Sequence, residues 1–226
     1  MTIARNAVVA LFAAFFALAA NAQSNPKKQL EDALSHDGLQ QAKVKGVAMV
    51  YTRPGASLAN YTKVQIDPVD VAFHKDWNPE RTGSRLKLSQ RERDDIRNGV
   101  AKIVEEQFAK VMQAKGGYQV VKEAGPDVLR LRPRIANLYV TAPDTGASMS
   151  RTYSVSAGEM TLFLEMFDSE TGAVMARVVD HKAARSDVRM RMSSKVLNAG
   201  EAEAVAAEWA RILRDAFDKA HGVGKN

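Results

Sequence analysis

The sequence contains no cysteine among its 226 residues. This absence excludes a disulfide framework, a zinc site built from thiolates and a cysteine nucleophile. It also removes the residue through which a bacterial lipoprotein is anchored to its membrane. We therefore expect the chain to be released as a soluble protein rather than held by a lipid anchor.

The usual signatures of catalysis and nucleotide binding are missing as well. The sequence has no glycine-rich phosphate loop ending in Lys-Ser or Lys-Thr, and the patterns G-x-G-x-x-G, H-E-x-x-H and G-x-S-x-G do not occur. No two of the four histidines are three or four residues apart, the spacing that would place both on one helix face. We therefore predict no metal site and no cofactor.

The first 22 residues have the features of a secretory signal peptide. A positive charge at Arg5 precedes the apolar run 7–20, and Ala20 and Ala22 supply the small residues that signal peptidase reads. We predict cleavage between Ala22 and Gln23, which gives a periplasmic or secreted protein. An uncleaved membrane anchor is the alternative, but it needs about 20 apolar residues and this run is shorter. No later segment approaches transmembrane length.

A β-hairpin is predicted over residues 160–180. Apolar side chains at every second position from Met160 to Met166 give the first strand one wholly apolar face, which we expect to point into a core. The turn 168–172 closes with Gly172, which adopts a left-handed conformation without Cβ strain. The return strand 173–180 repeats the apolar face.

Two long amphipathic helices are also predicted. The first begins with a capping box, in which Ser89 is followed three residues on by Glu92, and it ends at the glycine pair 116–117. The second begins at Asn198 and ends before Gly222. In both, apolar residues recur at spacings of three and four, so each helix presents one apolar stripe to a core.

The remaining strands complete an α+β pattern. They are expected over residues 47–51, 61–73, 118–121 and 128–141. The apolar parity of the second one changes at Asp67-Pro68, where a one-residue bulge would keep both halves facing the core. The fold class that follows is α+β, a two-layer sandwich whose twisted, mostly antiparallel sheet carries both long helices on one face.

No internal repeat and no long linker divides the chain into several domains. We therefore predict four parts: a signal peptide over 1–22, a flexible or short helical segment over 23–46, a single α+β domain over 47–222 and a disordered tail over 223–226.

Two clusters of basic residues are candidate binding sites in this chain of formal net charge +6. Arg130, Arg132 and Arg134 alternate with apolar residues, so their guanidinium groups point to the same side of a strand. They could bind phosphate or carboxylate. Alternatively, they form a solvated sheet face on which they pair with acidic residues of a neighbouring strand. The modest excess of positive charge is compatible with a polyanionic partner and equally with ordinary solubility.

The second basic cluster follows the hairpin and contains Arg185, Arg189 and Arg191. In a loop it would be exposed and could contact an anionic glycan or lipid. It has no aromatic residue on which a base could stack, and this disfavours a nucleic-acid partner.

Several segments resemble a known bacterial envelope family. The segments 51–58, 61–64 and 66–69 are similar to the opening of the family known as domain of unknown function 3313, and 127–131 and 167–172 are similar to its later parts. Many such proteins look like lipoproteins, and this chain departs from them in lacking the anchoring cysteine. The family brings no established activity, so the resemblance implies no catalytic residue.

Together these features favour a non-enzymatic binding or accessory module of the cell envelope. Its partner would be another envelope protein or an anionic envelope polymer, bound through an edge strand or one basic cluster. The alternative is a hydrolase of an envelope polymer, with its site in the loops 74–87 and 143–157. A deep pocket that brings His74 or His181 together with a carboxylate and a serine would favour the hydrolase.

Overall fold

The computed structural model describes residues 25–77, 89–141, 156–183 and 195–223. These residues form an eight-stranded mixed sheet with the strand order β1-β2-β8-β7-β6-β3-β5, and β4 pairs with β6 beyond the end of β3. The strands are β1 (Gln40–Ala42), β2 (Met49–Thr52), β3 (Lys63–Ile66), β4 (Asp70–Phe73), β5 (Gln119–Val121), β6 (Val128–Thr141), β7 (Ser156–Asp168) and β8 (Val174–Ala183).

Strand pairing within these residues divides the sheet into two parts. From β1 to β6 every neighbouring pair is antiparallel, whereas β3 and β4 run parallel to β6 and β5 runs parallel to β3. The parallel part is the crossover unit expected from the sequence, in which α3 (Gln90–Gln113) connects β3 and β4 to β5. The predicted α+β class is confirmed, and the antiparallel pairings are in the majority.

The predicted hairpin forms the centre of the antiparallel part. Residues 160–166 of β7 lie opposite 176–182 of β8, and Met160, Leu162 and Leu164 are almost completely buried. Gly172 has a φ of 69°, and its N–H donates to the carbonyl of Asp168 at 2.9 Å. The left-handed conformation at the end of the turn is therefore as predicted.

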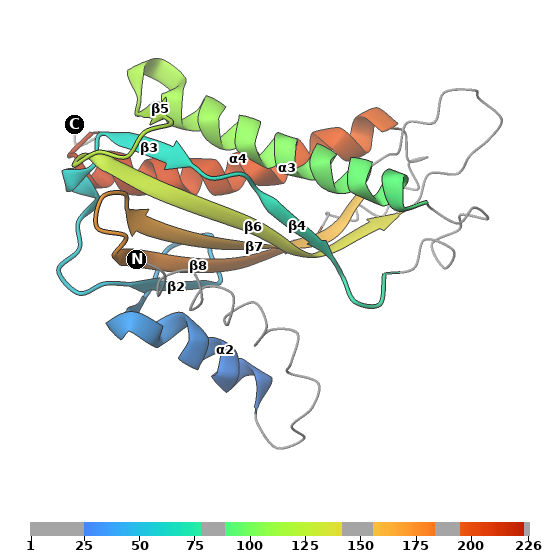
Figure 1. Ribbon diagram of the computed structural model, residues 1–226, viewed down its shortest axis with the longest axis horizontal. Helices are drawn as coiled ribbons and strands as arrows, with labels where there is room; N and C mark the ends of the chain where they lie inside the picture. Colours follow the sequence, from blue (N-terminus) through green and yellow to red (C-terminus); the bar gives the residue numbers. More distant parts are fainter. Residues whose placement is uncertain (1–24, 78–88, 142–155, 184–194, 224–226) are drawn as a thin grey trace.

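Both long helices lie on the same face of the sheet (Figure 1). The capping box at Ser89 and Glu92 is present at the start of α3. The second helix, α4 (Lys195–Ala220), begins three residues before Asn198, so the prediction that Asn198 starts the helix is wrong. The helices and the sheet enclose the main core, where Phe108 and Phe217 are completely buried.

The break expected at Asp67-Pro68 separates β3 from β4. Ile66 lies opposite Leu131 and Asp70 lies opposite Arg134, so four steps along this segment match three steps along β6. One extra residue is thus accommodated, as a bulge requires. Val64 and Val71 are consequently both buried in the main core although they lie on opposite sides of the break.

The opposite face of the sheet is covered over part of its area by α2 (Pro26–Ser35), which lies on the side away from α3 and α4 (Figure 1). Leu34 and the following Leu39 form a small second core with Tyr51 of β2 and Val179 of β8. The segment predicted to be flexible or short helical therefore contains a helix that packs on the sheet. Whether 47–222 is an independent domain stays a prediction.

Candidate functional site

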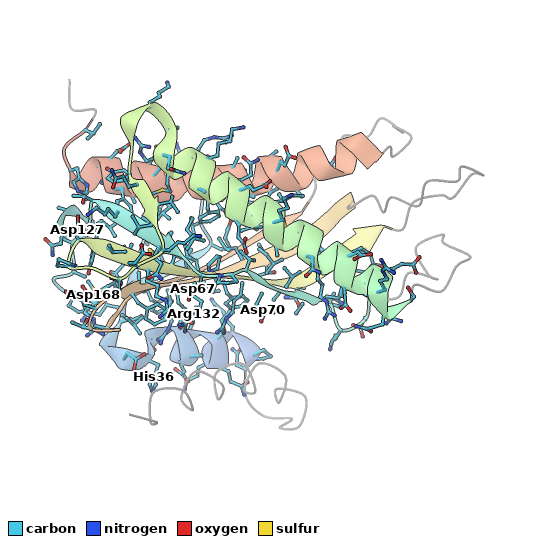
Figure 2. The ribbon with its side chains drawn as sticks, turned by 45° about the horizontal axis from the view of Figure 1, so that its top comes forward. His36, Asp67, Asp70, Asp127, Arg132 and Asp168 are labelled. Carbon is cyan, nitrogen blue, oxygen red and sulfur yellow. The ribbon has the colours of Figure 1, made fainter. Side chains whose placement is uncertain are left out.

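The candidate site is the sheet face that carries α2, at the point where α2 no longer covers it. Residues with even numbers in β6, from Arg130 to Arg134, point to this face because their neighbours Leu129, Leu131 and Ile135 point into the main core. We call Arg130, Arg132 and Arg134 the arginine patch. Figure 2 shows Asp67, Asp70 and Arg132 along the sheet above α2.

Asp67 holds two members of the arginine patch. Its carboxylate oxygens accept hydrogen bonds from the Nε of Arg130 at 2.8 Å and from the Nε of Arg132 at 3.1 Å. The Asp67 side chain is only 13% exposed, whereas those of Arg130 and Arg132 are 40% and 21% exposed. The carboxylate therefore lies beneath the two guanidinium groups and fixes them from the protein side.

The aromatic ring of Phe167 gives Arg132 a second support. Phe167 lies opposite Arg130 in the register of β6 and β7, and the Cζ of Arg132 is 4.7 Å from the centroid of its ring. Stacking on an aromatic face is a favourable contact for a guanidinium group and leaves its edges available for hydrogen bonds. Arg132 is thus held by its Nε and by one face of its planar group.

The terminal nitrogens of these two arginines remain available. Within the part of the chain that the structure describes, Arg130 and Arg132 donate only through Nε, to Asp67. A shallow depression surrounds them, lined by Asp67, Pro68, Asp70, Arg130, Arg132, Pro133 and Arg134. This lining contains three cationic side chains and two anionic ones, so positive charge is in excess.

A row of alternating charges extends from the arginine patch to α2. Glu165 lies opposite Arg132 in β7 and accepts from the Nε of Arg177 in β8 at 3.2 Å. Arg177 also donates to the carboxylate of Asp37 at 2.5 Å and to the carbonyl of His36 at 2.8 Å. Its side chain is only 6% exposed, so this end of the row is a structural tie rather than an open site.

The contacts with Arg177 and His36 lower the pKa of the Asp37 carboxyl group. Burial tends to raise the pKa of Asp37, but hydrogen bonds from Arg177 and His36 outweigh burial and hold the pKa below its ordinary value. The ionised form of Asp37 is therefore favoured in the folded protein. Sequence reasoning did not find Asp37, Glu165 or Arg177, because their meeting depends on where α2 packs.

The second predicted basic cluster, Arg185, Arg189 and Arg191, lies outside the described residues. The same is true of most of the loops 74–87 and 143–157, in which the hydrolase alternative would place its site. The predictions for these residues therefore stay predictions.

The described histidines lie in separate places. The N–H of Asp76 donates to Nδ1 of His74 at 3.1 Å, whereas His181 contacts the hydroxyl of Thr161 at 3.2 Å and Glu159 at 3.6 Å. No group of three or more histidine, aspartate or glutamate side chains placed to hold a metal ion occurs among the described residues. The described part of the chain also has no helix with the length and apolar character needed to cross a membrane.

Solved structures with low sequence identity resemble this fold. The PelC dodecamer from Paraburkholderia phytofirmans is 13% identical, with a TM-score of 0.36, and the match covers 73% of this chain and 96% of that chain. A DUF330 protein from Xanthomonas campestris is 9% identical, with a TM-score of 0.44, and the match covers 76% of this chain and 94% of that one. No curated protein matches the sequence significantly.

The family comparison agrees with the resemblance seen in the sequence. The model of the family described as "Protein of unknown function (DUF3313)" matches residues 29–213. This match includes most of α2, the entire sheet and most of α4. The chain therefore belongs to the DUF3313 family.

Proposed function

We propose that this chain is an exported, non-enzymatic binding module of the bacterial cell envelope that holds an anionic group of another envelope component on the arginine patch. The observation that carries the proposal is the arrangement of Arg130 and Arg132. Both are fixed through Nε by Asp67, and their terminal nitrogens donate to no described residue.

This arrangement suits recognition of phosphate or carboxylate. A guanidinium group offers two parallel N–H bonds to an anion, and such charge-assisted bonds are stronger than neutral ones. Because Asp67 and Phe167 already restrain the two arginines, less side-chain freedom is lost when an anion binds. The exposed position on the sheet admits a polymer or the surface of a protein as readily as a small ion.

The position of the arginine patch also favours it over an edge strand as the contact surface. The two strands at the ends of the strand order, β1 and β5, have three residues each. Short edge strands are one way in which proteins avoid pairing with other chains. The export part of the proposal depends on the apolar segment 7–20 and the predicted cleavage after Ala22.

Retention of the mature chain, residues 23–226, on anionic matrices tests this proposal. Phosphocellulose and heparin-agarose provide phosphate and sulfate groups, and elution in a salt gradient reports the strength of binding. We expect R130Q/R132Q/R134Q to elute at a clearly lower salt concentration than the wild type. A salt gradient can show this difference, because about 0.1 M salt already screens exposed charge interactions.

A variant with the same loss of charge elsewhere is the control. Arg91, Arg93 and Lys110 are exposed on α3, on the other side of the sheet, so R91Q/R93Q/K110Q lowers the net charge equally without touching the arginine patch. Equal elution of the two triple variants would show that only net charge matters and would overturn the proposed site.

A further inference from the structure

A second candidate site lies inside the protein, on the other side of the sheet. A partly enclosed cavity of about 150 Å³ lies between α4 and the strands β2, β7 and β8. The segment 43–48, which connects β1 to β2, closes part of it. Its lining consists of Val44, Val47, Val50, Thr52, Ala56, Ser57, Leu58, Tyr61, Leu162, Leu164, Met166, Met175, Ala176, Val178, Trp209, Ile212, Leu213 and Ala216.

The lining is almost wholly apolar. Of its few polar side chains, Tyr61 donates its hydroxyl to Asp168 at 3.1 Å, and Ser57 accepts from the N–H of Ala59 at 3.2 Å. A cavity of this volume with apolar walls has room for an apolar group about the size of a benzene ring and does not hold ordered water. The ligand part that fits the cavity is therefore a hydrocarbon.

Polar contacts at one wall keep the cavity in shape. Asp180 accepts from the N–H of Ala48 at 2.9 Å and from the indole N–H of Trp209 at 2.8 Å, which ties the segment 43–48 to α4. Gly46 in that segment has a φ of 86°, and a Cβ at this position would be 3.2 Å from Cδ1 of Ile212. This distance is shorter than an ordinary van der Waals contact, so the segment rests directly on the helix.

The entrance combines an exposed apolar residue with positive charge. Val44 lines the cavity and is 36% exposed, which makes it one of the two large apolar residues that are exposed within the described part of the chain. It stands between Lys43 and Lys45, both exposed and without an ion pair to any described residue. An apolar interior whose exposed lining residue Val44 is flanked in sequence by two lysines is complementary to a molecule that has a hydrocarbon chain and an anionic head.

We propose that this cavity binds the end of an acyl chain of an anionic amphiphile, with the head group next to Lys43 and Lys45. The chain could belong to a free fatty acid or to an anionic lipid, and these share the chemistry that the cavity would recognise. This proposal is independent of the arginine patch, because the two sites lie on opposite faces of the sheet and share no residue.

Quenching of tryptophan fluorescence tests the proposal directly. The chain has two tryptophans, and Trp209 lines the cavity whereas Trp77 stacks on Phe73. W77F keeps an aromatic ring beside Phe73 and leaves Trp209 as the only fluorophore of its kind. In the W77F protein we expect saturable quenching by dodecanoate that carries bromine on its terminal carbon, because bromine quenches only at contact.

A variant that fills the cavity provides the decisive comparison. Ala216→Leu places a larger side chain at the lining, and Ala109→Leu makes the same change on α3, outside it. We expect A216L to lower the apparent affinity measured by quenching about tenfold, since part of the acyl chain can no longer be buried. A109L should leave this affinity unchanged. Far-UV circular dichroism confirms folding, and A56L fills the same cavity from another wall if A216L does not fold.

The remaining probes identify the head group and its source. K43Q/K45Q should weaken dodecanoate binding while leaving that of brominated dodecanol unchanged, since only the former carries a charge. Phosphatidylglycerol vesicles with brominated acyl chains show whether the ligand can be a membrane lipid and not only a free fatty acid. The proposal is overturned if brominated dodecanoate does not quench Trp209, or if Trp209 is quenched equally in A216L and A109L. It is also overturned if only a small molecule such as toluene enters the cavity.

Discussion

The two faces of the sheet differ in what holds them. The face beneath α3 and α4 is a continuous apolar core, in which Phe108, Leu131 and Phe217 are completely buried. Among the described residues, the face that carries α2 has a small apolar cluster around Leu34, and beside it the row of charges from Asp67 to Asp37. Burial of apolar area stabilises the first face, whereas pairing of charges organises the second and leaves part of it open.

The main core and the arginine patch thus have different roles, the first in stability and the second in binding charged groups. Completely buried side chains of the main core, such as Phe108 and Phe217, cannot reach a partner at the surface, whereas the terminal nitrogens of Arg130 and Arg132 donate to no described residue. Substitutions on the two faces should therefore affect different measurements.

Truncation of a phenylalanine should be most harmful on the apolar face. Phe108 is completely buried in the main core, so F108A is expected to lower the free energy of unfolding by about 3–5 kcal/mol. Phe167, on the face with the arginines, is 9% exposed, and F167A should lower it by roughly 2 kcal/mol. Urea denaturation measures both values. A loss for F167A as large as that for F108A would contradict the division between the faces.

Removal of the buried guanidinium group of Arg177 should have the next largest effect on stability. Arg177→Met leaves Glu165, which is only 17% exposed, without its cationic partner and removes the hydrogen bonds to Leu34 and His36 at the end of α2, so we expect a loss of about 3 kcal/mol. Unfolding in urea, followed by circular dichroism, gives this value. If R177M were as stable as the wild type, the charges on this face would not hold α2 in place.

High pH should destabilise the apolar face through a tyrosine. Burial, and then the hydrogen bond and charge of Asp218, raise the pKa of Tyr118 from 10.0 to about 12. Its contribution to stability is fully present below pH 10 and is lost as the pH rises toward 12, because the unfolded chain ionises first. The difference in unfolding free energy between wild type and Y118F should therefore shrink from pH 8 to pH 11, and a constant difference would argue against this cause.

Neutralising the arginine patch should have the smallest effect on stability. The pairs that Arg130 and Arg132 make with Asp67 are partly exposed, and such pairs contribute roughly 0–1 kcal/mol each. R130Q/R132Q/R134Q should therefore melt within a few degrees of the wild type in a thermal scan while losing retention on phosphocellulose. A large fall in melting temperature would assign the patch to stability rather than to binding.

Local sequence signals predicted much of this fold correctly. The alternation in 160–166, the left-handed Gly172 and the capping box at Ser89 each depend on residues close together in sequence, and each is present. The start of α4 was missed because Asn198 resembles an N-cap, although the helix already runs through it. A local capping signal is also compatible with a position inside a helix.

Contacts between distant residues could not be predicted in the same way. Asp67 was expected at the break in the strand, where it lies, but its two arginines are 63 and 65 residues away. Their meeting requires the parallel register of β3 on β6, which no local pattern specifies. Arg130 and Arg132 do pair with an acidic residue, but Asp67 lies between β3 and β4 and not on a strand, as the alternative had it.

Photo-cross-linking in intact cells tests the central claim most directly. A photoreactive amino acid at Asp70, exposed beside the arginine patch, should join the protein to an envelope component, whereas one at Lys102, exposed on α3, should not. We predict that the product formed from Asp70 disappears when R130Q/R132Q/R134Q is present in the same chain. Equal products from both positions, or survival of the Asp70 product in that variant, would contradict the account.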